Sequence, residues 1–260
     1  MLLSTLSGKW GGPAVHRRIL VTGARRGIGA AIAVGLAGPS RTLLLHHLAA
    51  ADEAERVARE CRDRGALAET LEADLTDPAS VRELAERAGA VDILVNNAAR
   101  PSNVDIGRLP LADWEATFAV NVTAPMLLAQ ALSAGMAMRG WGRIVNVASV
   151  TVRLGGPSGP AYVSSKAALI GLTRSLAGAL GPSGVTVNAL SPGAILTDGE
   201  RELAGGQDPA EAHAGILAAQ AIPRHLVPAD LVAAVRFMVS DGASALTGQV
   251  LEVGGGLVYR

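Results

Sequence analysis

The chain has 260 residues, of which 49% are hydrophobic and 18% are charged, and equal numbers of basic and acidic residues give it a formal net charge of zero. This composition can supply a sizeable core, excludes a disordered chain, and lacks the basic excess that a nucleic-acid footprint requires. The single cysteine, Cys61, excludes an internal disulfide and a cysteine-based zinc cluster, and we expect no metal site.

The amino terminus has neither the basic leader nor the long apolar core of a signal peptide. The sequence contains no uninterrupted apolar run near the roughly 20 residues that cross a bilayer. These features predict a soluble, cytoplasmic protein without a membrane or nucleic-acid partner. Residues 1–15 are rich in glycine and are expected to form a loose arm before the folded domain.

A glycine-rich turn follows the first predicted strand, at 18–21, and precedes a helix with a strongly apolar face. In this context, backbone N–H groups and the helix N-terminus bind phosphate, because glycine lets the anion approach the backbone. The spacing is G-x-x-x-G-x-G rather than the usual G-x-G-x-x-G, so the glycines alone are a weak indication. The turn reads Thr22-Gly23-Ala24-Arg25-Arg26-Gly27-Ile28-Gly29.

The second predicted strand, at 41–46, ends at His46, about 20 residues past the glycines, where an NAD site would place an acidic residue for the ribose diol. No carboxylate stands at that strand end, whereas Arg25 and Arg26 lie in the glycine turn. We therefore expect a 2′-phosphate there, with NADP(H) preferred and NAD(H) as the alternative. Asp52 and Glu53 are expected in the first turn of the next helix, where negative charge is favourable.

The rest of the chain alternates between predicted strands and helices. This order predicts one α/β domain over residues 16–260, built on a doubly wound parallel sheet with helices on both faces. Residues 198–222 are small and polar, and they predict a substrate lid. The further strands are expected at 67–73, 91–95, 143–148, 185–190 and 249–253, and the further helices at 52–64, 78–88, 111–138, 161–180 and 228–239.

The candidates for catalysis lie between residues 149 and 166. Ser149 follows a buried strand, a loop rich in glycine and proline comes next, and Tyr162 and Lys166 are then four residues apart on one helix face. An ammonium near a phenol favours the phenolate and lowers a pKa that is otherwise near 10, so such a tyrosine exchanges protons near neutral pH. Taken alone, this pair is more often a solvated helix face.

Asparagines add two further candidates. Asn96 and Asn97 follow the fourth predicted strand, at the carboxyl edge where ligands of open α/β sheets bind, with loop filling as the alternative. Asn121 lies within the long apolar segment at 111–138, where a satisfied core asparagine is the alternative.

The combined motifs resemble those of the classical short-chain dehydrogenase/reductases, and most closely the 3-oxoacyl-carrier-protein reductases among them. Over residues 17–256 they read T-G-x-x-x-G-I-G, D-L, N-N-A, N, S, Y-x-x-x-K and P-G-x-I-x-T. The resemblance implies a Rossmann fold and hydride transfer between a nicotinamide cofactor and a ketone or secondary alcohol, with a carrier-bound acyl group among the candidate substrates. It also implies a homo-oligomer, a tetramer or dimer, in which the helices at 111–138 and 161–180 pack between subunits.

The resemblance also implies residue roles. Tyr162 would be the general acid and base, Lys166 would lower its pKa and hold the nicotinamide ribose, and Ser149 would bind the substrate oxygen. Asn121 would help to order a water that connects Lys166 to a proton path. Tyr162 and Lys166 would share cofactor binding with Gly23, Arg25, Arg26, Gly27, Ile28 and Gly29, with the strand-end His46, and with Asp74, Leu75, Asn96, Ala98, Pro192, Gly193, Ile195 and Thr197.

Two alternatives stay open. One is a cofactor-binding sensor or scaffold that keeps the fold without chemistry, which would be expected to lose the tyrosine or the lysine. The other is a lyase or epimerase on the same fold. The chain also departs from the family pattern at Ala99, where glycine is usual, and at Gly254, where aspartate is common.

Overall fold

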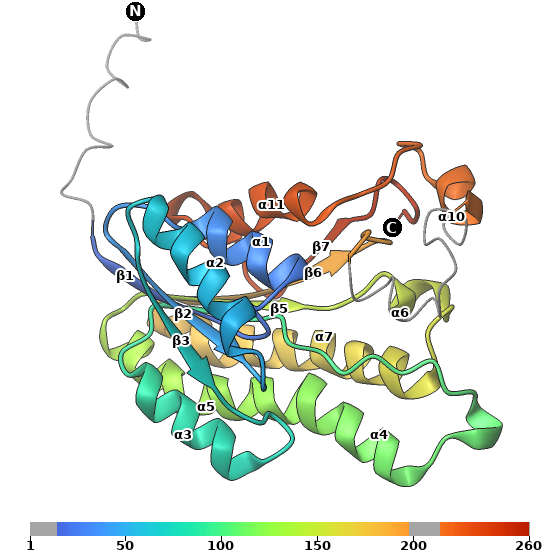
Figure 1. Ribbon diagram of the computed structural model, residues 1–260, viewed down its shortest axis with the longest axis horizontal. Coiled ribbons are helices and arrows are strands. Elements are labelled where there is room, and N and C mark those ends of the chain that lie inside the picture. Colours follow the sequence, from blue (N-terminus) through green and yellow to red (C-terminus); the bar gives the residue numbers. More distant parts are fainter. Residues whose placement is uncertain (1–14, 198–213, 260) are drawn as a thin grey trace, which may run out of the picture.

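The computed structural model of the protein describes residues 15–197 and 214–259. Seven parallel strands form one sheet in the order β3-β2-β1-β4-β5-β6-β7, with helices on both faces (Figure 1). The predicted doubly wound parallel sheet in a single α/β domain is therefore confirmed. The strands are β1 (Arg17–Val21), β2 (Arg41–His47), β3 (Leu67–Glu72), β4 (Ile93–Asn96), β5 (Gly142–Val147), β6 (Val185–Pro192) and β7 (Val250–Val253).

Two apolar cores fill the spaces between the sheet and its helix layers. Because successive side chains of a strand point to opposite faces, Ile19 and Val21 of β1 enter one core and Leu20 enters the other. Strands buried on both faces read as continuous apolar runs, as Arg41–His47 does with Leu43, Leu44 and Leu45. The first layer holds α1 (Gly27–Leu36), α2 (Ala51–Asp63) and α11 (Val232–Met238), and the second holds α3 (Pro78–Ala88), α4 (Leu111–Phe118), α5 (Ala124–Met138) and α7 (Pro160–Leu180) (Figure 1).

The apolar segment at 111–138 is not one regular helix. A π-helical turn, η2 (Ala119–Thr123), separates α4 from α5 and contains Asn121. Pro125 has no N–H to donate to the carbonyl of Asn121 four residues earlier, which explains a break in the α-helical pattern here. By length and composition alone this stretch could cross a membrane, but α5 packs against α3 and buries Leu128 and Leu132 in the second core.

Two other predicted segments differ in detail. The link between Ser149 and Tyr162 is not all loop, because it contains the short helix α6 (Thr151–Leu154). The predicted helix at 228–239 begins as a 3-10 turn, η4 (Pro228–Leu231), before α11. The remaining short elements are η1 (Ile106–Arg108), η3 (Gly181–Ser183), α10 (Ala214–Ala219) and η5 (Asp241–Ala243).

The expected arm and lid fall largely outside the described residues. Positions 1–14 of the arm and 198–213 of the lid are not described, and the described end of the lid region contains α10.

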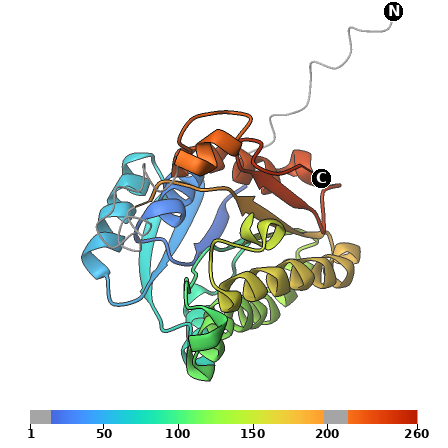
Figure 2. The same cartoon turned by 90° about the vertical axis from the view of Figure 1, so that its right-hand side faces the viewer.

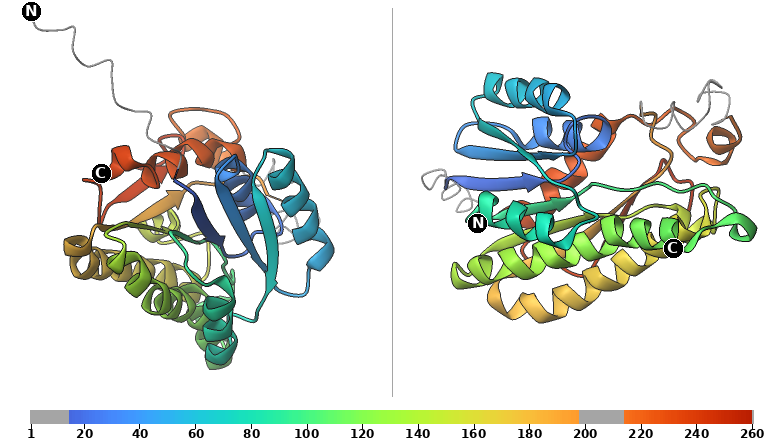
Figure 3. Two further views of the ribbon diagram at one scale, coloured as in Figure 1. Left: turned by 90° about the vertical axis from the view of Figure 1, so that its left-hand side faces the viewer. Right: turned by 60° about the horizontal axis from the view of Figure 1, so that its bottom comes forward.

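The carboxyl ends of the strands and their amino ends lie on opposite sides of the molecule and are followed or preceded by different loops. Figure 2 looks onto the carboxyl ends of the strands, where the glycine turn, the asparagine turn and the segment after β5 converge. Figure 3, left, looks onto the opposite edge, where the strands begin. Because all strands are parallel, every predicted motif that follows a strand reaches the same edge, which is where ligands of such sheets bind.

Candidate active site

A cleft of about 690 Å³ lies at the carboxyl edge of the sheet. It brings together predicted site residues from six separate stretches of the chain, between the glycine turn and the segment after β6. Of the predicted residues, the cleft is lined by Gly23, Arg25, Arg26, His46, Asp74, Leu75, Ala98, Tyr162 and Thr197; His47, Leu48, Ala73, Thr76, Asn97, Ala99, Arg100, Pro101 and Val120 complete its wall.

The glycine turn has a geometry that requires its glycines. Gly23 and Gly27 have φ values of +63° and +58°, in the left-handed region that side chains disfavour. A Cβ atom at Gly29 would collide with the carbonyl oxygen of Gly23. The first turn of α1 starts at Gly27, so its first N–H groups have no intrahelical acceptor. Helix starts of this kind are common sites for phosphate.

His46 supports this turn from below. Its Nδ1 accepts the N–H of Gly23 at 3.0 Å, and its Nε2 lies 3.1 Å from the carbonyl oxygen of Ala73. This arrangement fixes the neutral ring with its proton on Nε2, and burial lowers the pKa of His46 to about 4. Both ring nitrogens of His46 are therefore hydrogen-bonded within the protein. Although His46 lines the cleft, these bonds indicate that it holds the glycine turn in place.

The asparagine turn is joined to the glycine turn by Asn97. Its Nδ2 donates to the carbonyl oxygens of Thr22 and Gly23, at 2.9 and 3.1 Å, and its N–H donates to Thr22 Oγ1 at 3.0 Å. Asn96 instead lies in the interior, where its Nδ2 donates to Asn146 Oδ1 at 2.8 Å. Strand alternation explains the difference, because adjacent residues point to opposite sides, and it places the amide of Asn97 rather than that of Asn96 at the cleft.

Tyr162 and Lys166 lie one turn apart on α7, as their spacing predicts. The Lys166 side chain is buried, and its Nζ donates to the carbonyl oxygen of Val147 at 2.7 Å. The same Nζ lies 5.6 Å from the ring centroid of Tyr162, which lines the cleft. Burial lowers the pKa of Lys166 to about 8, because the interior disfavours the ammonium.

Ser149 lies just past the end of β5. Its Oγ accepts two hydrogen bonds from Thr151, one from the N–H at 3.2 Å and one from the hydroxyl at 2.9 Å. A hydroxyl has one proton and two lone pairs, so both acceptor positions of Ser149 are filled while its proton stays available for donation. The short helix α6, which the sequence did not predict, positions the donors.

Asn121 is buried in the π-helical turn, and its side chain is fully engaged. Its Oδ1 accepts the N–H of Arg100 at 2.8 Å, and its Nδ2 donates to Ser165 Oγ at 2.9 Å. These bonds match the alternative of a satisfied core asparagine for the side chain. Asn121 thereby connects the loop after β4 with α7.

Further predicted residues lie outside the cleft wall. Pro192 ends β6, and Gly193 and Ile195 follow it, but of this described segment only Thr197 lines the cleft. Ile195 is buried and bridges to Leu226. Gly27, Ile28 and Gly29 form the start of α1 beside the cleft rather than its wall.

One arginine of the glycine turn, Arg25, forms an ion pair that the sequence did not predict. Arg25 forms an ion pair with Glu53 at 3.0 Å, and both side chains are partly exposed. Glu53 does lie in the first turn of α2, as predicted, but its partner is 28 residues away and could not be read from local sequence. Arg100 also lines the cleft and pairs with Asp113 at 3.1 Å. Among the described residues, no three His, Cys, Asp or Glu side chains are placed to hold a metal ion.

Comparison with known proteins agrees with this geometry. A family model described as short chain dehydrogenase matches residues 17–208. A probable galactose dehydrogenase of Rhizobium meliloti is 35% identical over 245 residues, which cover 93% of this chain and 94% of that protein. A 3-oxoacyl-acyl-carrier-protein reductase of Synechocystis is 34% identical over 244 residues, covering 92% and 96%.

Solved structures give the same result. A putative NAD(P)-dependent gluconate 5-dehydrogenase from Beutenbergia cavernae, with NADP bound at low occupancy, superposes with a TM-score of 0.87 at 38% identity. The match covers 95% of this chain and 99% of that one. The chain therefore belongs to the short-chain dehydrogenase family and is an NAD(P)-dependent oxidoreductase.

Proposed function

We propose that the protein is an NADP(H)-preferring ketoreductase that interconverts a ketone and a secondary alcohol, with Tyr162 as the general acid and base. The observation that carries this proposal is the burial of Lys166 beneath Tyr162. Lysine is rarely buried without an acidic partner, and within the described part of the chain Lys166 pairs with no carboxylate. Burying an ammonium costs free energy. The Lys166 ammonium lies 5.6 Å from the ring centroid of Tyr162, and its positive charge there favours the phenolate form of that tyrosine.

The proposed reaction assigns each side chain a step at a stated atom. Ser149 donates its free hydroxyl proton to the substrate oxygen and orients it, since Thr151 fills both acceptor positions of Ser149 Oγ. Tyr162 Oη gives a proton to that oxygen during reduction and takes it back during oxidation. Two donors set in place before reaction stabilise the charge that develops on the oxygen. Bound NADP(H) supplies or accepts the hydride.

The proton path from Lys166 runs, in this proposal, through the backbone of Asn121. The side chain of Asn121 is fully engaged by Arg100 and Ser165, whereas Pro125 provides no N–H for the Asn121 carbonyl. We therefore propose that the Asn121 carbonyl oxygen, rather than the Asn121 side-chain amide, binds the water that connects Lys166 to the proton path.

The preference for NADP(H) rests on charge around the glycine turn. Arg25 and Arg26 line the cleft next to the end of β2, where His47 and Leu48 provide no carboxylate for a ribose diol. Glu53 competes for Arg25, and both Arg25 and Arg26 are expected to contact a 2′-phosphate. NAD(H) is the alternative cofactor.

Turnover with the Tyr162→Phe variant tests the mechanism. NADPH oxidation is measured with a panel of β-ketoacyl, sugar-derived and cyclic ketones, and we expect the variant to lose at least about a hundredfold in kcat. Tyr259→Phe is the matched control, because Tyr259 is the chain's other tyrosine and is exposed. Near-normal turnover by Tyr162→Phe would show that the acid is assigned wrongly.

The same assay separates the alternatives. NADP(H) binding without oxidation on any substrate would favour a sensor or scaffold. Product formation without net change of the cofactor would favour a lyase or epimerase.

We further propose a cytoplasmic homo-oligomer, a tetramer or dimer, that uses α4, α5 and α7 between subunits. Exposed apolar side chains on this layer, Leu111, Met126 and Met138, support the proposal. Sedimentation at micromolar concentration tests it, and a monomer would refute it.

A further inference from the structure

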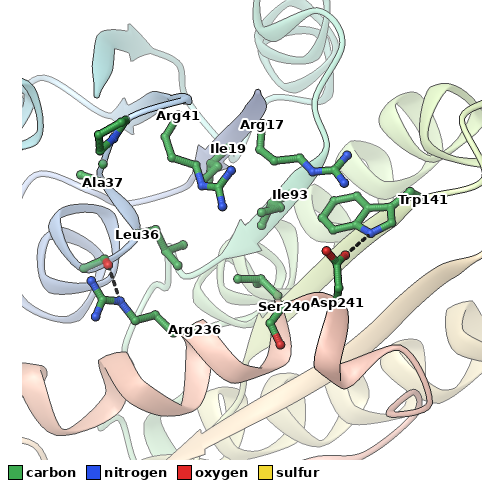
Figure 4. A pocket seen from close by; sticks show the side chains of 14 residues that line it. Arg17, Ile19, Leu36, Ala37, Arg41, Ile93, Trp141, Arg236, Ser240 and Asp241 are labelled. Carbon is green, nitrogen blue, oxygen red and sulfur yellow. Dashed lines mark hydrogen bonds between the residues drawn. The ribbon is translucent and has the colours of Figure 1, made fainter. Parts of the chain in front are cut away.

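A second cleft, of about 420 Å³, lies at the opposite edge of the sheet, where the strands begin (Figure 4). Its walls are the starts of β1 and β2, the end of α1, Trp141 before β5, and the segment from α11 to η5. No lining residue is shared with the active-site cleft. The proposed reaction therefore uses nothing in this second cleft.

The cleft holds two arginines, Arg17 and Arg41, on neighbouring strands. Arg17 and Arg41 are paired directly across neighbouring strands, so their Cα atoms lie about 5 Å apart. Like charges opposite each other on a sheet are destabilising. Burial, and next the charge of Arg17, lower the pKa of Arg41, while the carboxylates of Asp241 and Asp92 act in the opposite direction.

Among the described residues, neither side chain forms a hydrogen bond or an ion pair with a carboxylate. In the described part of the chain, the Arg17 guanidinium contacts only the Trp141 ring, at 3.5 Å from its centroid. Arg41 Nη1 donates to the carbonyl oxygens of Val15 and Ser40 at 3.3 and 3.4 Å, which are long bonds. Most N–H donors of both side chains therefore have no acceptor among the described residues. Figure 4 shows the Arg41 guanidinium directed into the cleft and the Arg17 guanidinium beside the Trp141 ring.

The other charged groups around the cleft leave it positive. Arg236 on α11 donates its Nε to the Gly35 carbonyl oxygen at 2.6 Å, and Arg143 on β5 lies over the Trp141 ring. Asp241 is the one acidic side chain of the lining; it is largely exposed and accepts the Trp141 Nε1–H at 2.8 Å. The carboxyl end of α1 adds a partial negative charge. Asp92, just before β4, also acts on Arg41, but its carboxylate pairs with Arg139 at 3.1 Å. The three lining arginines outweigh these negative contributions.

We propose that this cleft is a second ligand site, which binds a small phosphate-type oxyanion between Arg17 and Arg41. Guanidinium groups present planar pairs of N–H donors that match phosphate oxygens, and two such groups lining one cleft suit a doubly charged anion. The anion relieves the repulsion between the two arginines and fills their open donors. Inorganic phosphate, pyrophosphate and a phosphorylated metabolite share this chemistry.

Calorimetric titration of the NADP⁺-saturated protein with inorganic phosphate and pyrophosphate tests the proposal. Saturation with NADP⁺ fills the predicted phosphate site of the glycine turn, so any remaining anion binding reports on another site. The double variant Arg17→Gln/Arg41→Gln should weaken binding at least about tenfold, because each charge-assisted hydrogen bond contributes about that factor. Arg108→Gln, at an exposed arginine far along the chain, is the matched control and should bind as the wild type does.

Asp241→Asn provides a change in the opposite direction. Asparagine keeps an oxygen that accepts the Trp141 N–H and removes the only negative side chain of the lining, so anion binding should tighten several-fold. This gain does not depend on the folding of the arginine variants, which circular dichroism checks separately. Citrate, titrated in parallel, should bind more weakly than pyrophosphate.

Three outcomes would overturn the proposal. The first is no binding of either phosphate at millimolar concentration, and the second is equal binding by the wild type and the double variant. The third is tighter binding of citrate than of pyrophosphate, which would make the ligand a carboxylate.

Discussion

Replacing Lys166 by methionine should abolish activity without destabilising the protein. Methionine has a similar length and no charge, so it fills the same buried space while removing the ammonium next to Tyr162. If the lysine were retained for stability, its loss would weaken the fold. If it is retained for chemistry, the fold should gain from its removal.

The expected change in stability follows from the pKa of Lys166. Burial lowers this pKa from an ordinary value near 10.5 to about 8. At pH 7 the folded protein therefore carries a buried ammonium at a cost of about 3 kcal/mol. The variant removes this cost but leaves the Val147 carbonyl without its donor, which costs about 1–3 kcal/mol. The net change is between about zero and 2 kcal/mol of stabilisation, equivalent to a Tm unchanged or raised by up to about 6 °C.

Two measurements on the same sample check this expectation. Thermal unfolding gives Tm, and NADPH oxidation gives kcat, which should fall at least about a hundredfold because Tyr162 loses its charged neighbour. Leu169→Met is the control, since Leu169 is buried on the same helix and carries no charge in either form. A Tm several degrees below that of the control would mean that the ammonium supports the fold. Retained turnover would refute the proton-transfer role of Lys166.

Three further predictions concern the glycine turn. Glu53→Gln should release Arg25 and raise the ratio of kcat/KM for NADPH over NADH several-fold; an unchanged ratio in steady-state kinetics would show that Arg25 takes no part in cofactor choice. Gly29→Ala should lower the unfolding midpoint in urea by the equivalent of about 1–3 kcal/mol and impair cofactor binding, because its Cβ would meet the Gly23 carbonyl; a normal midpoint would contradict the close approach. The folded-state pKa of His46 is about 4 and the unfolded value is near 6.5, so the unfolded chain binds more protons between these pH values. Stability should therefore fall by up to about 3 kcal/mol as the pH drops from 6.5 to 4, and His46→Asn should flatten this dependence in urea titrations at the two pH values.

The sequence predicted features that depend on neighbours along the chain. Alternating apolar strands and helices determined the parallel α/β sheet, because each element is recognised by its own periodicity. The spacing of Tyr162 and Lys166 placed them on one helix face for the same reason. The helix predicted from residue 78 begins there as α3, and the Asp77 side chain caps it. The π-helical turn also has a local cause in Pro125, which has no N–H.

Contacts between distant segments were decided only by the tertiary structure. The sequence could not show that Lys166 is buried beneath β5, that Asn97 rather than Asn96 faces the cleft, or that Glu53 engages Arg25. Likewise, Arg17 and Arg41 became a pair only through the register of β1 and β2. Each of these facts depends on which strand ends meet and how far each is shifted along its neighbour. Local periodicity identifies the elements, but burial and electrostatics arise where the elements pack against one another.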